Sequence, residues 1–579
     1  MKIQITYDRE KHRFVIRCPF HANELVMDIP SRRWHKASRS WLAPALRQNV
    51  AYIQEVLRPL ADIDDRAEEA IAGYLAEAVM PGKNGFPSWY PYKTKPMKHQ
   101  SRNANYLYGL KAMGVFNDMG TGKTKLAIDL ACAMRMEGKI NTVLVLCKYT
   151  LRKNWEAEWQ KHAAIPYSLF LPESPQGKRY AQWMKQDHDF RVMVMGIESF
   201  SQGSAIELAD RFLLSTTTAL TVIDESQYIS NPKAVRSERI VSLGRKSEYR
   251  IAMTGTPIDK GPMNLYMQFE FLDPDIIGIG DYYAFRNRYA VMGGFRVNGK
   301  PTQIVAYQHL DELINVVSPF VVQVRKSEVL DLIPKGYERR VLAMHPAQRE
   351  LYRSMRKEKA YEWKGQQVTL KNVLELYLRL HQICGGHTVT KYKEPKIDKK
   401  TGDEIEITKS EYHQIVTQDE NPKIQEILSI LGETDEQAVI WCVYNPEIDE
   451  VVDAIQKKFP DRVVGQLRGG STETYRDEMV QAFQRGEVNY IVGNQKTGGT
   501  GYNMFASQLC IYYNNTFSMR DRMQSEDRLH RHGQTGAVKY IDLIMEKSID
   551  EVILDAIAEK MDVSEFIRGK LDLVLQDLD

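Results

Sequence analysis

A glycine-rich segment at residues 117–124 has the residue types needed to bind phosphate. It reads Asn-Asp-Met-Gly-Thr-Gly-Lys-Thr and leads into Lys125–Met136, whose apolar spacing predicts a helix. Glycines let backbone N–H groups curl around phosphate oxygens, and a helix N-terminus favours negative charge. Lys123 would then contact the β- and γ-phosphates, and the Thr124 hydroxyl would bind Mg²⁺. The segment predicts a nucleotide site, although Asn117 stands where the strict pattern begins with Gly.

An apolar strand ending in two acids lies about 100 residues further along, where Thr221-Val-Ile leads into Asp224 and Glu225. Nucleotide hydrolysis needs one carboxylate that holds Mg²⁺ through water and another that orients or deprotonates the attacking water. Alone, such a strand end could equally be a helix N-cap. Together with the upstream Lys-Thr loop it predicts a catalytic pair, with Asp224 on the metal and Glu225 on the water.

Two arginines near the C-terminal end, Arg528 and Arg531, are three residues apart. On a helix this spacing would place both guanidinium groups on one face. In a nucleotide hydrolase of two lobes, such arginines can cross the cleft and neutralise charge on the transferring phosphoryl group. A solvated basic helix face is the alternative, and it is the simpler interpretation of the arginines taken alone.

Two α/β patterns in the sequence are expected to position these groups. In residues 90–275 short buried strands alternate with helical patterns, which is typical of a parallel sheet covered on both faces. The predicted strands there are Thr142–Cys147, Arg191–Gly196, Ala219–Ile223 and Arg250–Thr254. The second pattern predicts strands at Ala438–Val443, Arg462–Leu467, Tyr490–Gly493, Gln508–Tyr513 and Val538–Ile544. Residues 275–420 are charged and are expected to be mostly helical, with a surface hairpin turning at Thr401-Gly402.

The composition is that of an ordinary globular chain, with 43% hydrophobic and 26% charged residues. No stretch approaches the roughly 20 apolar residues of a membrane helix, and the N-terminal residues lack the apolar core of a signal peptide. Six scattered cysteines favour a reducing compartment. We therefore expect a cytoplasmic protein with no membrane segment.

The positive charge of the chain is concentrated near its N-terminus. Residues 1–60 contain 11 Lys and Arg against 5 Asp and Glu, whereas the whole chain has a net charge of only +3. Within this segment Arg32 and Arg33 adjoin Trp34, a combination suited to phosphate contact and to stacking on exposed bases. The alternative is that Trp34 and the nearby Trp41 form the core of a small β-rich domain; the two interpretations are compatible.

In this order, the phosphate loop, the acidic pair and the arginines resemble the Swi/Snf-type branch of helicase superfamily two. The resemblance extends over about 480 residues from Lys95. Further blocks that match the family are Pro96–Gln100, Val143–Cys147 followed by Trp155, Met253–Ile258, Arg325–Leu330, Leu378–Cys384, Lys496–Asn503 and Gln524–Gln534. Gln227 departs from the family, where many relatives have His, but another polar residue at this position leaves hydrolysis expected.

The resemblance implies an α/β fold of two RecA-like parallel-sheet lobes with helical insertions and a small α+β N-terminal module. The expected ranges are 1–80 for the module, 90–275 for the first lobe, 276–420 for helical protrusions and linker, and 421–579 for the second lobe. It also implies ATP and Mg²⁺ as cofactors. The residues expected around ATP are Gln100, which would contact adenine, and Gly120, Thr121, Gly122, Lys123 and Thr124. Gln534 joins the expected catalytic residues, and the positions expected to couple nucleotide to nucleic acid are Gln227, Thr254, Gly255, Thr256, Gly498, Gly499 and Gly501.

The activity that the resemblance implies is that of a DNA-dependent ATPase that moves along duplex DNA, remodelling or annealing it, as in DNA repair or recombination. A strand-separating DNA or RNA helicase is one alternative, and an ATP-switched nucleic-acid clamp that does not move is another. The segment around Arg32, Arg33 and Trp34 is weakly similar to the HARP-type module of annealing helicases, which adds forked or branched DNA as an expected partner. Without a chromatin-reading module, a nucleosome remodeller is disfavoured, and we expect a monomeric bacterial or phage protein.

Overall fold

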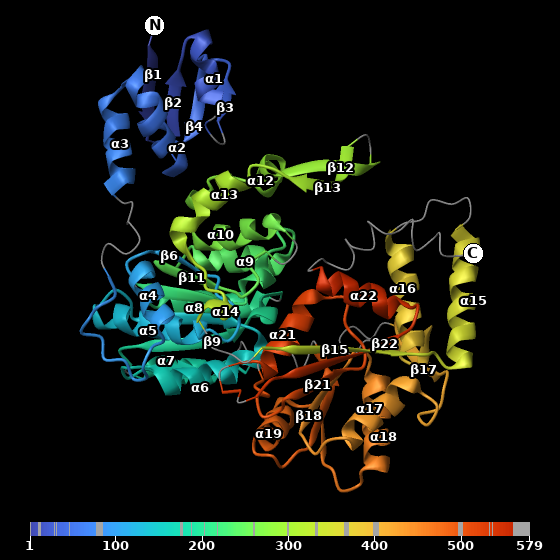
Figure 1. Ribbon diagram of the computed structural model, residues 1–579. Coiled ribbons are helices and arrows are strands. Elements are labelled where there is room, and N and C mark those ends of the chain that lie inside the picture. The colour runs from blue at the N-terminus through green and yellow to red at the C-terminus, as the bar shows by residue number, and fades with distance from the viewer. Residues whose placement is uncertain are drawn as a thin grey trace. The chain divides into compact units, whose positions relative to one another are not determined.

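A computed structural model of the 579-residue chain gives the fold (Figure 1). The structure describes residues 2–9, 13–27, 29, 32–45, 47–76, 85–173, 178–186, 188–201, 203–216, 218–258, 261–297, 300–329, 334–363, 370–397, 404–495, 502–531, 533–534 and 536–559. The chain divides into two compact units, Met1–Val329 and Leu330–Asp579. Within the described ranges, no helix has both the length and the apolar character required to span a bilayer.

The first unit begins with a small α+β module built on a five-stranded sheet of order β3-β4-β2-β1-β5. Ile3 and Ile5 of β1 and Phe14 and Ile16 of β2 alternate into its core. Its strands are β1 (Ile3–Asp8), β2 (Arg13–Arg17), β3 (Arg33–His35), β4 (Ser40–Pro44) and β5 (Ala61–Ile63), and its helices are α1 (Asn23–Met27), α2 (Arg47–Tyr52) and α3 (Asp65–Ala76). The sequence runs Lys2–Thr6 and Arg13–Cys18 predict β1 and β2. Strand β4 is not predicted, and β3 and β5, with three residues each, are too short to show a period.

The rest of the first unit is a lobe around a seven-stranded, all-parallel sheet of order β14-β6-β11-β10-β7-β9-β8. Leu144 and Leu146 of β7 enter the core on one face and Val143 and Val145 enter the core on the other. The strands are β6 (Ala112–Val115), β7 (Thr142–Cys147), β8 (Ser168–Phe170), β9 (Arg191–Gly196), β10 (Ala219–Asp224), β11 (Tyr249–Met253) and β14 (Val321–Val322). Helices α4 (Lys98–Leu107), α5 (Lys123–Met136) and α6 (Arg152–His162) pack in one of these cores; α7 (Lys178–Lys185), α8 (Gly203–Leu214), α9 (Val235–Gly244) and α10 (Leu265–Leu272) pack in the other.

Strand β6 leads into the phosphate loop, yet the sequence pattern does not predict it. It is four residues long and contains Gly114, which weakens any strand signal. A Cβ at Gly114 would lie 2.8 Å from Val321 Cγ2 on the neighbouring β14. The glycine is therefore needed for the close approach of β14, and its reason lies in tertiary packing.

The expectation that residues 275–420 are mostly helical is wrong for much of this range. It contains the helices α11 (Pro274–Ile277), α12 (Tyr282–Tyr289), α13 (Leu310–Val317), α14 (Lys326–Val329), α15 (Pro346–Trp363) and α16 (Leu370–Cys384), but also the antiparallel hairpins β12 (Ala290–Val297) with β13 (Lys300–Tyr307) and β16 (His387–Ile397) with β17 (Glu404–Gln414). The second hairpin is the predicted one, although its turn at Thr401-Gly402 lies outside the described residues. The first has an Asn298-Gly299 pair between β-prone runs, a hairpin signal that could have revealed it.

The second unit is a lobe around a six-stranded, all-parallel sheet of order β15-β22-β21-β18-β20-β19. Its strands are β15 (Gly336–Leu342), β18 (Ala438–Cys442), β19 (Val464–Leu467), β20 (Tyr490–Asn494), β21 (Leu509–Tyr512) and β22 (Lys539–Met545). Ile440 faces a core with α17 (Pro422–Gly432) and α18 (Asn445–Lys458), while Trp441 faces a core with α19 (Glu473–Gln484) and α21 (Met519–Leu529). Helices α15 and α16 pack with α22 (Ile549–Ala558) in a further core. The edge strand β15 escapes sequence prediction because Glu338, Arg339 and Arg340 give it a charged surface pattern.

Candidate active site

The phosphate loop runs from the end of β6 to the first residue of α5. Gly120 and Gly122 both have a φ of 78°, in the left-handed region that glycine adopts without strain. A Cβ at Gly122 would lie 2.2 Å from Gln100 Nε2, so this position also needs a residue without a side chain. Lys123 begins α5, which puts its charge at the helix N-terminus, and Thr124 follows half-buried. The loop has the tight, glycine-dependent form that the sequence predicts.

Two side chains of helix α4 hold the phosphate loop through hydrogen bonds to its backbone carbonyl groups. The His99 ring N–H donates to the Thr121 carbonyl oxygen at 2.8 Å, and Gln100 Nε2 donates to the Gly122 carbonyl oxygen at 3.0 Å. Gln100 Oε1 accepts the Met97 backbone N–H at 2.8 Å. The predicted adenine contact thus lies against the phosphate loop itself. Sequence patterns did not single out His99, whose only signal is its place beside Gln100.

Lys123 is directed toward the start of the loop. Its Nζ donates to the Asn117 carbonyl oxygen at 2.9 Å and to the Asp118 carbonyl oxygen at 3.2 Å. The Thr121 hydroxyl donates to the same Asp118 carbonyl at 2.7 Å. Asn117 is buried, with 1% of its surface exposed. The Asn at this position is accommodated inside the loop and leaves both glycines in place.

The acidic pair lies at the end of β10, as predicted: Asp224 is the last residue of the strand and Glu225 follows it. Asp224 Oδ2 accepts the Trp155 indole N–H at 3.0 Å, and Oδ1 accepts the Glu225 backbone N–H at 3.0 Å. Burial, with a smaller contribution from the Glu225 carboxylate, raises the pKa of Asp224 to about 6 against the opposing effects of Lys123 and the Trp155 N–H. Asp224 is thus a desolvated carboxylate within the electrostatic reach of the phosphate-loop lysine, an environment suited to binding a cation.

Glu225 has a left-handed backbone, with φ 55° and ψ 54°, which is strained for a residue with a side chain. Its Oε2 accepts a hydrogen bond from Gln227 Nε2 at 2.7 Å. Such strain concentrates at functional positions, where the surrounding structure holds it. Gln227, expected to be a coupling residue, is here the residue that fixes the Glu225 side chain.

Thr254, Gly255 and Thr256 form a turn after β11, the strand that lies between β6 and β10. Thr254 Oγ1 accepts the Thr256 backbone N–H at 2.9 Å, and a Cβ at Gly255 would lie 3.3 Å from the Met119 backbone nitrogen. This turn lies against the phosphate loop, and the strand that precedes it pairs with the end of β10, where Met253 is opposite Asp224. The three predicted blocks of the first lobe therefore form one site.

In the second lobe, the prediction that Arg528 and Arg531 share one helix face is wrong. Helix α21 ends at Leu529 and His530 is non-helical, with φ −89° and ψ 83°. Arg528 donates to the Tyr502 carbonyl oxygen at 3.5 Å, and Arg531 donates to Asn503 Oδ1.

The neighbouring predicted residues differ in what the structure says of them. Gln534 Nε2 donates to the carbonyl oxygens of Ser507 at 2.9 Å and Leu529 at 3.2 Å, so it joins the segment after the predicted glycines to the end of α21. Gly498, Gly499 and Gly501 themselves lie outside the described residues. The helix also carries Arg522, which sequence spacing did not reveal because its partners, among them Asp542, are distant in the chain.

The N-terminal basic segment forms the β3–β4 hairpin of the small module. Trp34 is 50% exposed, whereas Trp41 is partly buried and donates its indole N–H to Asn23 Oδ1 at 2.9 Å. The two rings meet edge to face with centroids 5.2 Å apart, and the Arg32 guanidinium lies 5.6 Å from the centre of the Trp41 ring. Arg33 is exposed beside Trp34. Of the two interpretations, the core one fits Trp41 and the surface one fits Trp34.

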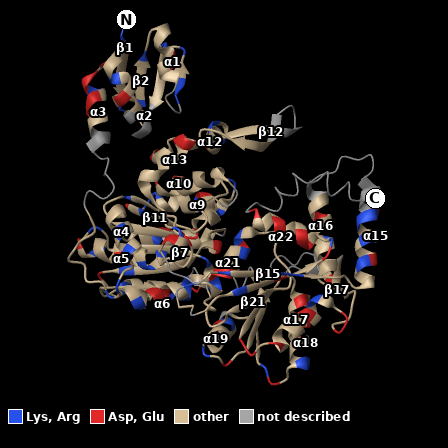
Figure 2. Ribbon diagram, in the orientation of Figure 1, with Lys and Arg blue, Asp and Glu red and all other residues tan. Residues whose placement is uncertain are grey.

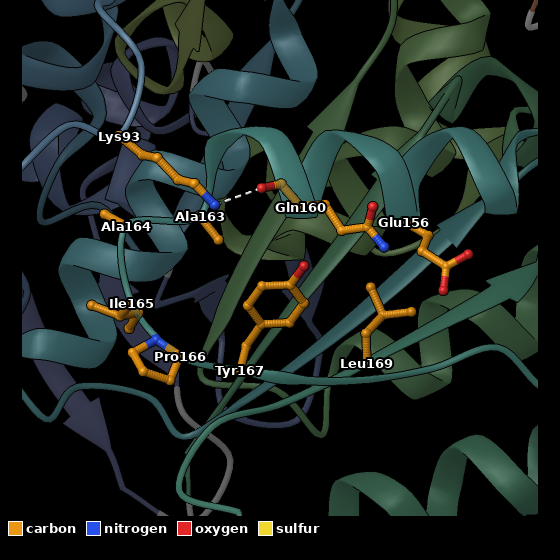
Figure 3. Close-up of a pocket in the computed structure, with 9 residues that line it drawn as sticks. All are labelled: Lys93, Glu156, Gln160, Ala163, Ala164, Ile165, Pro166, Tyr167 and Leu169. Atoms are coloured by element: carbon orange, nitrogen blue, oxygen red, sulfur yellow. Dashed lines mark hydrogen bonds between the residues drawn. The ribbon is translucent and has the colours of Figure 1, made fainter.

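A separate hollow of about 600 Å³ lies on the first lobe, between α6 and β8 (Figure 3). Lys93 lines it and donates to the Gln160 carbonyl oxygen at 2.6 Å. Its other lining residues are Glu156, Ala163, Ala164, Ile165, Pro166, Tyr167 and Leu169. None of the predicted site residues lines it, so the hollow is distinct from the nucleotide site.

A phosphate loop, an acidic strand end and a polar turn on neighbouring parallel strands, together with a second parallel-sheet lobe, define a two-lobed nucleotide hydrolase. Residues 99–388 match the SNF2-related domain and residues 422–533 match the helicase conserved C-terminal domain. The chain belongs to the Swi/Snf-type family of helicase superfamily two. At the level of this family it is a DNA-dependent ATPase with two RecA-like lobes.

The chain is similar to proteins from several organisms. It is 23% identical to Chromodomain-helicase-DNA-binding protein 1-like of Danio rerio, over 79% of this chain and 42% of that protein. It is 24% identical to ATP-dependent helicase brm of Drosophila melanogaster, over 79% of this chain and 28% of that protein. The chain thus spans less than half the length of these relatives. A solved Sulfolobus solfataricus SWI2/SNF2 ATPase core in complex with dsDNA aligns at 21% identity over 83% of this chain and 94% of that one, with a TM-score of 0.37.

Proposed function

We propose that this chain hydrolyses ATP to drive movement along duplex DNA. The observation that carries the proposal is the convergence of Lys123 after β6, Asp224 at the end of β10 and Thr254 after β11, three adjacent strands of one parallel sheet. Family membership supports DNA as the activating ligand. A translocase is preferred to a strand-separating helicase because the Swi/Snf-type blocks extend beyond the ATPase core, through Arg325–Val329 and Leu378–Cys384.

The residues of the first lobe fit an ATP complex of Mg²⁺. Lys123 would neutralise the β- and γ-phosphates, while Thr124 and Asp224 would hold Mg²⁺, which when bound offsets charge on the phosphate oxygens. Glu225, fixed by Gln227, would accept the proton of the attacking water. Arg528 and Arg531 of the second lobe would stabilise the transferring phosphoryl group once the lobes close.

Coupling to DNA is assigned to the turns around these groups. Thr254, Gly255 and Thr256 are proposed to move when the phosphate loop changes conformation, since Gly255 packs against Met119 of that loop. Gln227 donates a hydrogen bond to the carboxylate of Glu225 and is proposed as a further coupling residue. The glycines Gly498, Gly499 and Gly501 are proposed as the corresponding element of the second lobe, by their resemblance to the family.

The N-terminal module is proposed to contact DNA and to favour forked or partly single-stranded substrates. Arg33 and Trp34 are exposed on one hairpin, and Lys36 and Arg39 are exposed in its turn. Figure 2 shows basic residues on this part of the module and acidic residues on α3. Guanidinium and ammonium groups would contact phosphate, and the half-exposed Trp34 ring would offer a stacking surface for an unpaired base.

The test is ATPase activity with duplex, single-stranded and forked DNA and with RNA, measured side by side, followed by displacement of a third strand from duplex DNA. We expect stimulation by duplex and forked DNA and ATP-dependent displacement of the third strand. Stimulation by single strands alone would favour a strand-separating helicase. ATPase activity without third-strand displacement would favour the clamp and contradict translocation.

A further inference from the structure

The buried indole of Trp155 is directed at the acidic strand end from a neighbouring helix. Trp155 lies on α6, is 1% exposed and donates its Nε1–H to Asp224 Oδ2 at 3.0 Å. The other carboxylate oxygen accepts the Glu225 backbone N–H at 3.0 Å. Both oxygens of Asp224 are therefore held by the protein itself.

Trp159, one helical turn further along α6, provides an internal comparison. It is equally buried at 1% exposure, and its ring packs against Tyr167 and Phe190, with centroids 5.1 and 5.9 Å away. Its indole nitrogen has no hydrogen-bond partner among the residues that the structure describes. The helix thus tolerates one buried indole without an acceptor, and the indole that has an acceptor is paired with the carboxylate proposed to hold the cation.

We infer that Trp155 is a positioning residue that orients the Asp224 carboxylate toward Mg²⁺-bound nucleotide, an inference that rests on the proposed function. The terminal torsion of an aspartate is broad, so an unanchored carboxylate samples many orientations. Anchoring both oxygens leaves the remaining lone pairs in fixed directions. Outer-shell partners of metal-binding groups typically contribute about 10- to 100-fold in metal affinity or activity. Trp155 acts through Asp224 and does not itself contact the ligand.

The test compares Trp155→Phe with Trp159→Phe, since each removes an indole N–H from the same helix and leaves an aromatic ring. We expect Trp155→Phe to raise the Mg²⁺ concentration for half-maximal ATPase about tenfold and to lower kcat by a similar factor. The KM for ATP at saturating Mg²⁺ should change little. Trp159→Phe should behave as the wild type. Equal Mg²⁺ dependence and kcat in the two variants would overturn the inference.

If Trp155→Phe does not fold, 3-benzothienylalanine is incorporated at position 155, which keeps the size and shape of the indole but lacks the N–H. The same rise in the Mg²⁺ requirement is expected, and a wild-type Mg²⁺ dependence would overturn the inference. Mg²⁺-dependent binding of a fluorescent ADP is measured in parallel. The two measurements separate the two hypotheses. A wild-type chain without DNA-stimulated ATPase activity contradicts the proposed function. Mg²⁺-dependent ADP binding that is unchanged in the variant contradicts only the role of Trp155.

Discussion

The carboxylate of Asp118, inside the phosphate loop, accepts a hydrogen bond at 2.9 Å from the backbone N–H of Lys326, the first residue of α14. Two backbone bonds extend this connection: the Asp118 N–H donates to Val324 O and the Phe116 N–H donates to Val322 O, both at 2.9 Å. The last described segment of the first unit is therefore joined residue by residue to the loop expected to hold phosphate. A change in the loop would be transmitted directly to the end of this unit.

We expect Asp118→Ala to loosen residues 321–329, because the first turn of α14 loses its acceptor. Loss of a helix-capping carboxylate costs about 1 kcal/mol, which is roughly a fivefold increase in local opening. Hydrogen exchange of peptides covering this segment measures it. Asp118→Asn keeps an acceptor oxygen and should exchange much as the wild type does. Unchanged exchange in Asp118→Ala would show that the backbone bonds alone hold the segment.

The buried strands were predictable from sequence because a parallel sheet covered on both faces needs continuous apolar runs. Thr142–Cys147 and Arg191–Gly196 match the observed β7 and β9. The phosphate loop and the acidic pair were predictable for a different reason, since phosphate and metal chemistry fix both residue type and spacing. Their location at the carboxyl ends of the strands then follows from the parallel-sheet fold.

The features of the site that the sequence does not predict depend on contacts between residues far apart in the chain. The pairing of Trp155 with Asp224 joins positions 69 residues apart, and nothing in either local pattern indicates it. The end of α21 at Leu529 removes Arg531 from the helix, although Gln534 then fixes the following turn by bonds to Leu529 and Ser507. A helical spacing predicts a shared face only where the helix continues.

Glu225→Gln should retain ATP binding and lose hydrolysis, because an amide cannot accept the proton of the attacking water. General-base catalysis contributes about 10² to 10⁴-fold, which sets the expected loss in kcat. Lys123→Ala should instead abolish turnover and weaken ATP binding. Glu207→Gln, an exposed acid on α8, is the control and should leave both unchanged. Near-wild-type turnover in Glu225→Gln would contradict the assignment of the acidic pair.

Arg531→Ala should lower DNA-stimulated turnover by about a hundredfold with little change in ATP affinity, because an arginine acting on the transition state contributes more to rate than to binding. Arg485, which forms a surface ion pair with Glu487 on the same lobe, offers a matched control. Arg485→Ala should leave kcat unchanged. Equal kcat for Arg531→Ala and Arg485→Ala would mean that Arg531 serves only as a hydrogen-bond donor to Asn503.

The shifted pKa of Glu447 predicts how the stability of the second lobe depends on pH. Its side chain is fully buried, accepts the backbone N–H groups of Val443 and Tyr444 at 3.0 Å, and lies near Lys423 and His387. Burial raises its pKa from 4.5 to about 8. The folded state therefore binds more protons than the unfolded state between these values, so stability falls as pH rises through this window.

Glu447→Gln removes this titration and should gain in melting temperature relative to the wild type between pH 6 and 8.5. Comparing the difference between the two chains at each pH cancels the contribution of other groups, including His387, whose pKa burial lowers to about 4. A difference that stays constant over this range would contradict protonation of Glu447 in the folded lobe.

Trp34→Ala tests whether the N-terminal hairpin contacts unpaired bases. Stacking contributes about 1–3 kcal/mol per base, so binding to forked DNA should weaken by roughly 5- to 150-fold while binding to blunt duplex changes little. Trp89 is the matched control, because it is 52% exposed on the first lobe against 50% for Trp34. Trp89→Ala should leave the preference for forks intact.

Arg33→Ala should act differently from both tryptophan variants, weakening binding to fork and duplex DNA alike and reducing the slope of log affinity against log salt by about 0.9 for duplex. Equal losses on fork and duplex for Trp34→Ala would mean that its ring supports the hairpin through Trp41, and the module would then contact DNA through charge alone.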